Sequence, residues 1–150
     1  MSPAEPGPLL RVRLGSGPRD GYVLPASSVA ATSTPGALAR SAHAPDGILG
    51  ITGLRGQVYT VVDMNRVAND EPLAAPQEGW LSIVAPSFGA GWALLWSNML
   101  GMADPTGWRR LGRPFGSPEW LTEIWETPEG EQWREVDVAA LLARWTAAPG

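Results

Sequence analysis

The chain has 150 residues, a formal net charge of −4 at pH 7 and 44% hydrophobic residues, which is typical of a single globular domain. All 11 basic residues are arginine, and the acidic balance argues against a nucleic-acid footprint over the whole surface. Because cysteine is absent, the sequence excludes a disulfide framework, a thiolate zinc site and a cysteine nucleophile.

The first eight residues and the overall apolar pattern bear on location. Residues 1–8 are rich in proline and have little to bury, so we expect this segment to be disordered. The segment lacks the basic and then apolar pattern of a signal peptide. No apolar run approaches the roughly 20 residues that a membrane helix needs. We therefore interpret the protein as cytoplasmic.

High glycine and proline content, 18 and 15 residues, predicts many turns and favours a β architecture. Leu9–Leu14 alternates between apolar and polar residues as a strand does, and Tyr22–Leu24 is a second strand that ends at Pro25. Ala26–Thr32 is predicted to form a helical turn followed by a strand.

Residues 33–47 are predicted to be a long loop rich in Ser, Ala, Gly and Pro. His43 lies in this loop with no cysteine, second histidine or carboxylate cluster nearby, so we interpret it as a surface residue and not as a metal ligand.

The strongest local pattern is a β-hairpin at Ile48–Val62. An apolar run to Leu54 is followed by Arg55-Gly56, a turn in which glycine takes a positive φ at no steric cost. The following run, Gln57–Val62, is rich in β-branched and aromatic residues. Asp63 or Asn65 is then placed to cap a short helical turn.

Two further strand pairs are predicted after a polar link at residues 68–79. Trp80–Ala85 and Trp92–Trp96 are apolar enough to be covered on both faces. Ser97–Met102 continues as a strand or tight turn. Trp120–Glu126 and Gln132–Val136 form the last pair.

A C-terminal helix is predicted after Asp137, which is placed as its cap. One apolar stripe at helical spacing supports it: Val138, Leu141, Leu142 and Trp145.

Residues 103–119 are predicted to be irregular. They carry Arg109, Arg110 and Arg113 beside Trp108, a combination that suits nucleic acid or an acidic partner. Three arginines in a loop are more often simply solvated, and flanking acidic residues weaken the local field.

The chain contains an internal echo. The pattern Gly56-x-x-Tyr59-x-x-Val62-Asp63 recurs as Gly130-x-x-Trp133-x-x-Val136-Asp137 at a constant offset of 74 residues (130 − 56 and 137 − 63). Each copy reads as turn, strand, aspartate cap and helix. This repeat predicts two similar β lobes, each made from about half of the chain.

The hairpin sequence at residues 50–64 also resembles the signature of the CheW-like adaptor domain of bacterial chemosensory arrays. The matching positions are Gly50, Leu54, Arg55, Gly56, Val61, Val62 and Asp63. Three positions depart from the family pattern: Gly53 where Asn is usual, Thr60 where Pro is usual and Asn65 where Arg is common. These departures, together with the segment that contains Met102, lean towards the PilI-type adaptors of pilus-linked twitching systems. They also leave open a degenerate copy that has lost one partner.

The resemblance implies a mostly β fold of two small SH3-like five-stranded β-barrels packed together, with short helical turns and a C-terminal helix. The domain would cover residues 9–150, with the chain crossing between the two lobes. It implies a non-catalytic adaptor without a cofactor or metal. The implied partners are the regulatory domain of a CheA-type histidine kinase and the cytoplasmic tip of a methyl-accepting chemoreceptor, with no nucleic acid and no membrane insertion.

The resemblance also implies which residues bind partners. Arg55, at the hairpin tip, matches the arginine tied to receptor and kinase coupling, and Gly56 completes its turn. Gly50 and Val29 match positions on the receptor-facing groove. Read from the sequence alone, Arg55 is also suited to bracing its own loop, and Gly50 and Val29 are packing residues.

Two other function classes were weighed. An enzyme is disfavoured because the sequence shows no phosphate loop and no serine elbow with a usable histidine, and Asp63 and Asp137 fit helix caps better than acids or bases. A Trp-rich β module that stacks on sugars is the alternative suggested by eight tryptophans. Core packing accounts for most of these tryptophans in our interpretation.

Overall fold

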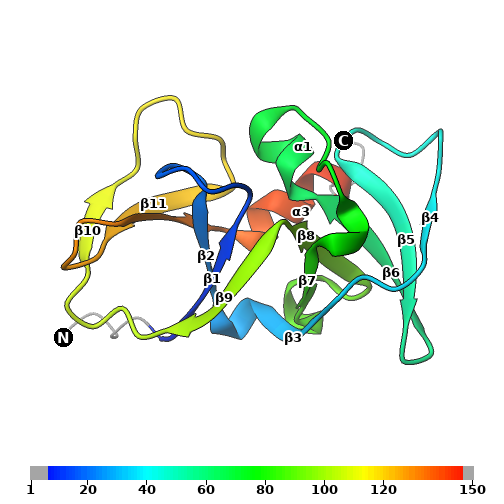
Figure 1. Cartoon of the computed structure of the whole chain (residues 1–150), viewed down its shortest axis with the longest axis horizontal. Helices are drawn as coiled ribbons and strands as arrows, with labels where there is room; N and C mark the ends of the chain where they lie inside the picture. Colours follow the sequence, from blue (N-terminus) through cyan, green and yellow to red (C-terminus); the bar gives the residue numbers. More distant parts are fainter. Residues whose placement is uncertain (1–6, 147–150) are drawn as a thin grey trace.

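The computed structural model describes residues 7–146, so most of the segment predicted to be disordered, residues 1–8, lies outside the described residues. The described chain forms two β lobes that lie side by side, with a helix between them (Figure 1). Lobe A contains β1 (Leu9–Arg13), β2 (Gly21–Pro25), β9 (Asn98–Ala103), β10 (Arg109–Gly112), β11 (Leu121–Glu126) and β12 (Gln132–Val136). Lobe B contains β3 (Val29–Ser33), β4 (Leu38–Arg40), β5 (Ile48–Leu54), β6 (Gln57–Asp63), β7 (Trp80–Val84) and β8 (Trp92–Trp96).

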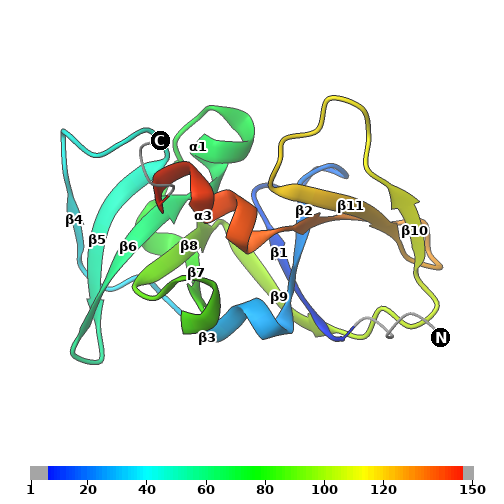
Figure 2. The same cartoon turned by 180° about the vertical axis from the view of Figure 1, so that it is seen from behind.

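The helices are short. They are α1 (Met64–Asn69), α2 (Pro86–Gly89) and α3 (Val138–Thr146), together with the 3-10 turns η1 (Ala26–Ser28) and η2 (Pro76–Glu78). Seen from behind, α3 leaves the end of β12 in lobe A and runs across to lobe B (Figure 2).

The two lobes share one topology in circularly permuted order. The strands of lobe B are ordered β3-β7-β8-β6-β5-β4, and those of lobe A β9-β1-β2-β12-β11-β10. In each lobe the strand that leads into an aspartate and a helix pairs in parallel with another strand: Thr60 lies opposite Trp92, and Arg134 opposite Tyr22. The internal echo in the sequence is therefore a real structural repeat.

The repeat does not build two consecutive halves. The middle of the chain, from β3 to β8, makes lobe B, whereas lobe A combines β1 and β2 with β9 to β12. Each lobe is thus made from about half of the chain, and lobe A combines two separate segments of it. The reason is that β1 and β2 take the places in lobe A that β7 and β8 take in lobe B.

The predicted fold class is confirmed: two small β lobes, short helical turns and a C-terminal helix. Each sheet has six strands instead of the expected five. The two additional strands, β4 and β10, lie at sheet edges in segments that the sequence predicted to be a loop and irregular structure. Side chains in β10 are exposed throughout and those in β4 mostly so, which leaves no apolar alternation to detect.

The core has three parts. Aliphatic side chains fill lobe B, where the buried members are Val61, Leu81, Ile83, Ala93 and Leu95. A smaller cluster fills lobe A with Leu9, Val23, Trp125 and Trp133. The largest cluster joins the two sheets and α3, and includes Leu10, Val12, Tyr22, Leu24, Val62, Leu94, Trp96, Trp120, Val136, Leu141 and Leu142.

Strands at the lobe interface bury both of their faces, as the sequence predicts for Trp92–Trp96. In β8, Ala93 and Leu95 point into lobe B, whereas Leu94 and Trp96 join the interface cluster. The predicted α3 stripe is buried at Val138, Leu141 and Leu142 in the same interface. Hydrophobic burial between the lobes therefore fixes their relative position.

Candidate partner-binding surfaces

The β5–β6 hairpin projects from lobe B, with its tip at the lower right of Figure 1. Leu54 pairs with Gln57, which leaves Arg55 and Gly56 as a two-residue turn. Both residues have positive φ, 51° and 79°, the requirement of the type I′ turn that matches the twist of a hairpin. Glycine takes this conformation freely, whereas a side chain there costs on the order of 1 kcal/mol.

Arg55 is exposed at this tip, and its guanidinium makes no hydrogen bond or ion pair with any residue in the described part of the chain. The interpretation that Arg55 braces its own loop therefore has no support in the structure. The outer face of the hairpin adds two apolar side chains, Ile51 at 47% exposure and Val58 at 65%. Val58 lies opposite Gly53, which has no side chain to cover it. We call Ile51, Arg55 and Val58 the hairpin surface.

The other two predicted partner positions lie away from the hairpin surface. Gly50 is buried beneath β4: a Cβ atom on it would lie 2.1 Å from the carbonyl oxygen of Ala39. Val29 begins the edge strand β3 and packs partly into the interface cluster. In the hydrogen-bonded order of the sheet, β7, β8 and β6 separate Val29 from β5. Only Arg55 and Gly56 thus lie together at an exposed tip.

Both aspartates act as helix caps. Asp63 is buried, and its carboxylate accepts hydrogen bonds from the backbone N–H groups of Asn65 (3.0 Å), Arg66 (3.2 Å) and Leu73 (2.9 Å). Asp137 is exposed and accepts one, from Ala140 at 3.0 Å. These bonds use the carboxylates to satisfy free N–H groups at helix starts and at the following loop.

A second candidate surface, which the sequence did not reveal, lies in lobe A. The loop after β10, at the upper left of Figure 1, carries Phe115 with its side chain fully exposed. The loop is braced: Arg113 Nη2 donates to the carbonyl oxygens of Ser117 (2.9 Å) and Pro118 (2.8 Å). Ser117 Oγ donates to the Pro114 carbonyl at 2.6 Å. An ordered loop that presents a bare aromatic ring has the properties of an interface anchor.

The three arginines beside Trp108 do not form a free basic patch. Arg109 is ion-paired with Glu126, and Arg110 lies 3.4 Å from Glu123 and stacks on the Trp125 ring at 4.6 Å. Arg113 braces its own loop. With these charges already matched, the segment offers little attraction for a polyanion.

The interior of lobe A contains charge as well as aromatic surface. Arg11 and Arg13 stack on the Trp133 ring at 6.0 and 5.2 Å. Glu135 faces Glu123 directly across the β11–β12 pair and accepts a 3.0 Å hydrogen bond from Trp125 Nε1. Burial raises the pKa of Glu135, the bond from Trp125 opposes this, and the negative charge of Glu123 raises the pKa further.

The eight tryptophans are mostly accounted for by packing. Trp96, Trp120, Trp125 and Trp133 are buried, and Trp92 stacks on Trp145 with ring centroids 5.8 Å apart. Trp80, at 38% exposure, is the most open tryptophan of the described chain. A row of exposed, parallel indole rings, which sugar stacking would need, is absent among residues 7–146.

Two searches within the described residues gave no further site. No cluster of three or more His, Cys, Asp or Glu side chains there is arranged to hold a metal ion. None of the helices in this part of the chain has the length and apolar character to span a membrane.

Comparison with known proteins was made for sequence and for structure. A family model described as CheW-like domain matches residues 8–145. No curated protein matches the chain. Among solved structures, the chain is similar to the scaffolding protein TtCheW from Thermoanaerobacter tengcongensis, with a TM-score of 0.68 and 16% sequence identity over 87% of this chain and 88% of that chain.

Proposed function

Because the chain belongs to the CheW-like domain family, we propose that it is a non-catalytic cytoplasmic adaptor that couples chemoreceptors to a CheA-type histidine kinase. The regulatory domain of the kinase and the cytoplasmic tip of a methyl-accepting chemoreceptor are the proposed partners. The scaffolding role in the name of the similar structure, TtCheW, is consistent with this proposal.

The observation that carries the proposal is Arg55. Asparagine or aspartate before glycine would make a more stable turn at this place, so an arginine is held there at a local cost. Backbone strain of this kind is concentrated at binding and catalytic sites. Arg55 supplies a planar guanidinium that can hold a carboxylate or carbonyl oxygens with two hydrogen bonds, and Ile51 and Val58 supply apolar area beside it.

An adaptor also needs a second surface. The hairpin surface and Phe115 lie in different lobes, at the lower right and upper left of Figure 1. Since the interface cluster packs the two lobes together, the molecule can act as a rigid link between two partners. We assign the hairpin surface to one partner and the Phe115 loop to the other.

The direct test is a pull-down with the kinase regulatory domain and, separately, with a receptor tip. Arg55→Asn keeps a residue suited to positive φ and removes the guanidinium, and we expect it to weaken binding of at least one partner by roughly tenfold or more. Arg144→Gln, an exposed arginine on α3, is the matched control and should bind as the wild type does. Wild-type protein that binds neither partner would refute the proposal.

A second variant separates the two surfaces. Phe115→Ser removes the exposed ring without touching the core, so the fold should be unchanged. We expect Phe115→Ser to weaken binding of the partner whose binding Arg55→Asn leaves unchanged. If Phe115→Ser has no effect on either partner, the loop is not a docking surface, whereas the role of Arg55 stands on its own test.

The departures from the family signature favour a PilI-type adaptor of a twitching system. Asn65 does not present a charge: its amide donates to the Glu71 carbonyl at 3.0 Å and accepts from Asn69 at 2.7 Å. The pull-down is therefore done with kinase and receptor pairs from both swimming and pilus-linked systems. Preference for the pilus-linked pair would support the PilI assignment, and preference for the swimming pair would reject it.

A further inference from the structure

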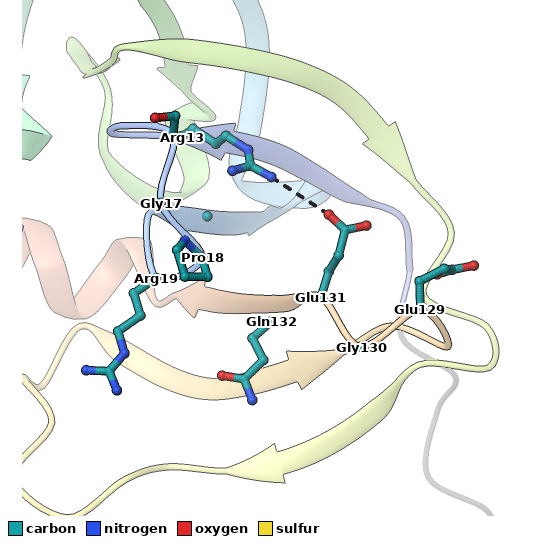
Figure 3. A pocket seen from close by; sticks show the side chains of 10 residues that line it. Arg13, Gly17, Pro18, Arg19, Glu129, Gly130, Glu131 and Gln132 are labelled. Atoms are coloured by element: carbon teal, nitrogen blue, oxygen red, sulfur yellow. Dashed lines mark ion pairs between the residues drawn. The ribbon is translucent and has the colours of Figure 1, made fainter.

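A hollow of about 540 Å³ opens in lobe A (Figure 3). It lies between the loop that joins β1 to β2 and the turn that joins β11 to β12. Arg13 and Glu131 point toward one another across it (Figure 3), and its lining also includes Glu129, Arg19, Ser16, Gly17, Pro18 and Gln132.

Arg13 is held in place without using its hydrogen-bond donors. Its guanidinium lies 5.2 Å from the centroid of the Trp133 ring. That ring packs against Gly21, where an added Cβ atom would lie 2.8 Å from it. Glu131 Oε2 is 3.8 Å away, too far for a hydrogen bond. Within residues 7–146 no acceptor bonds the Arg13 guanidinium, so its planar fork remains available.

A second arginine on the same ring is also incompletely paired. Arg11 lies 6.0 Å from the Trp133 centroid, and its Nη2 donates to the Leu100 carbonyl at 3.3 Å. Its Nε–H is buried and has no acceptor among the described residues. A buried donor of a charged group without an acceptor is costly. Both guanidinium groups therefore keep donor capacity that no described acceptor uses, and of the two only Arg13 lines the hollow.

We propose that this hollow is a binding site for an oxyanion, in which two oxygens of a carboxylate or phosphate group bind the Arg13 fork above Trp133. Arg19 adds a positive charge to the lining and Glu129 a negative one, and Ser16 and Gln132 are its neutral polar residues. Bidentate bonds to arginine are the strong and directional way to hold such a group.

Glu131 acts as a built-in competitor at this site. Its side chain is 56% exposed and only loosely paired with Arg13, so it can turn toward solvent when a ligand arrives. Until then its carboxylate lies where an external oxyanion would bind. Removal of the Glu131 charge should therefore strengthen binding, whereas removal of the Arg13 charge should weaken it.

The test uses the full chain and two probes, inorganic phosphate and a tri-glutamate peptide blocked at both ends. Binding is followed by NMR through the indole N–H signal of Trp133, which lies against Arg13. We expect Arg13→Gln to weaken binding at least tenfold and Glu131→Gln to strengthen it about three- to fivefold. Arg144→Gln is the matched control, because Arg144 also stacks on a tryptophan, Trp145, at 5.2 Å but lies outside the hollow.

The two probes distinguish the sources of the oxyanion. Binding of phosphate alone identifies a free phosphate group, and binding of the peptide alone identifies acidic side chains of a protein. The proposal is overturned if neither probe shifts the Trp133 signal, or if Glu131→Gln binds no more tightly than the wild type. Because Glu131 is an exposed turn residue, that second variant remains informative even if Arg13→Gln does not fold.

Discussion

Lobe B and lobe A have the same strand order but different interiors. Lobe B is filled by valine, leucine, isoleucine and alanine, and partly buried Tyr59 packs against them. Lobe A places Trp125 and Trp133 among Arg11, Arg13 and Arg110, with Glu123 and Glu135 opposite them. The same topology can thus be stabilised by aliphatic packing or by stacking of guanidinium groups on indole rings.

This difference affects which parts of each lobe a ligand can reach. An aliphatic interior is closed to polar ligands, so lobe B can use only its surface, and its candidate site is the hairpin tip. The interior of lobe A is open at its ends, where Arg13 and Arg110 reach hollows at the surface. Four predictions test or refine the contrast between the lobes.

The largest expected effect is a cavity in lobe B. Leu95→Ala should lower the free energy of unfolding by about 3 to 4 kcal/mol, because rigid aliphatic neighbours cannot close the gap. Leu9→Ala, the matched change in lobe A, should cost only about 2 kcal/mol, since Leu9 lines an open hollow that water can enter. Urea unfolding measures both, and equal costs would show that the two interiors pack alike.

Loss of a helix cap should also cost more stability in lobe B than in lobe A. Asp63→Ala leaves three backbone N–H groups without an acceptor at a buried site, so we expect a loss of about 3 kcal/mol. Asp137→Ala removes one exposed bond and should cost about 1 kcal/mol. Thermal unfolding of the two variants tests whether the stability loss is larger for Asp63→Ala than for Asp137→Ala. A larger loss at Asp137 would contradict the structural account of the caps.

Glu135 should make the stability of lobe A depend on pH. Burial raises its pKa above the ordinary value of 4.5, the bond from Trp125 and the charge of Arg110 oppose the shift, and Glu123 and Asp137 add to it. The folded protein therefore holds the proton more tightly than the unfolded chain, and stability falls as pH rises from 4.5 through the folded pKa.

Glu135→Gln should remove this pH dependence while keeping an oxygen that accepts the Trp125 N–H. We expect the variant to be more stable than the wild type at pH 7 by less than about 1 kcal/mol, with the difference shrinking below pH 4.5. Unfolding curves between pH 4 and 8 provide the measurement. A variant that is less stable at pH 7 would mean that the ionised carboxylate is favoured there.

The smallest effect concerns the hairpin of lobe B. Arg55→Asn should raise the free energy of unfolding by up to about 1 kcal/mol, because asparagine tolerates positive φ better than arginine does. A gain in stability combined with a loss of partner binding would identify Arg55 as a residue retained for recognition. If Arg55→Asn instead destabilises the protein, the arginine supports the fold.

Local patterns accounted for much of the fold. The hairpin around Arg55-Gly56, the doubly buried strand at Trp92–Trp96 and the stripe on α3 were all predictable, because their signals lie within a few adjacent residues. Strands β4 and β10 were missed because exposed edge strands exist through pairing with distant neighbours. The family resemblance implied that the chain crosses between the lobes, but local patterns do not show which strands make up lobe A.

The candidate sites also separate into those with a local sequence signal and those that depend on contacts between distant residues. Arg55 was predictable from its turn, since the following Gly56 marks the positive-φ position. The burial of Gly50 beneath Ala39 depends on β4, and the stacking of Arg13 on Trp133 joins residues 120 positions apart (133 − 13). Phe115 gave no periodic signal, because its exposure results from a loop braced by Arg113.

The permuted strand order also dictates a sequence of events on the ribosome. Every strand of lobe B is made before β9, so this lobe can fold as soon as β8 has emerged, whereas β1 and β2 are synthesised first yet wait for their parallel neighbour β12. During that interval the backbone groups along the edge of β2 that later pairs with β12 have no partner strand. Strands β9 to β12 are therefore synthesised last, and the β1–β2 hairpin is joined to the rest of its sheet only after β12 has been made.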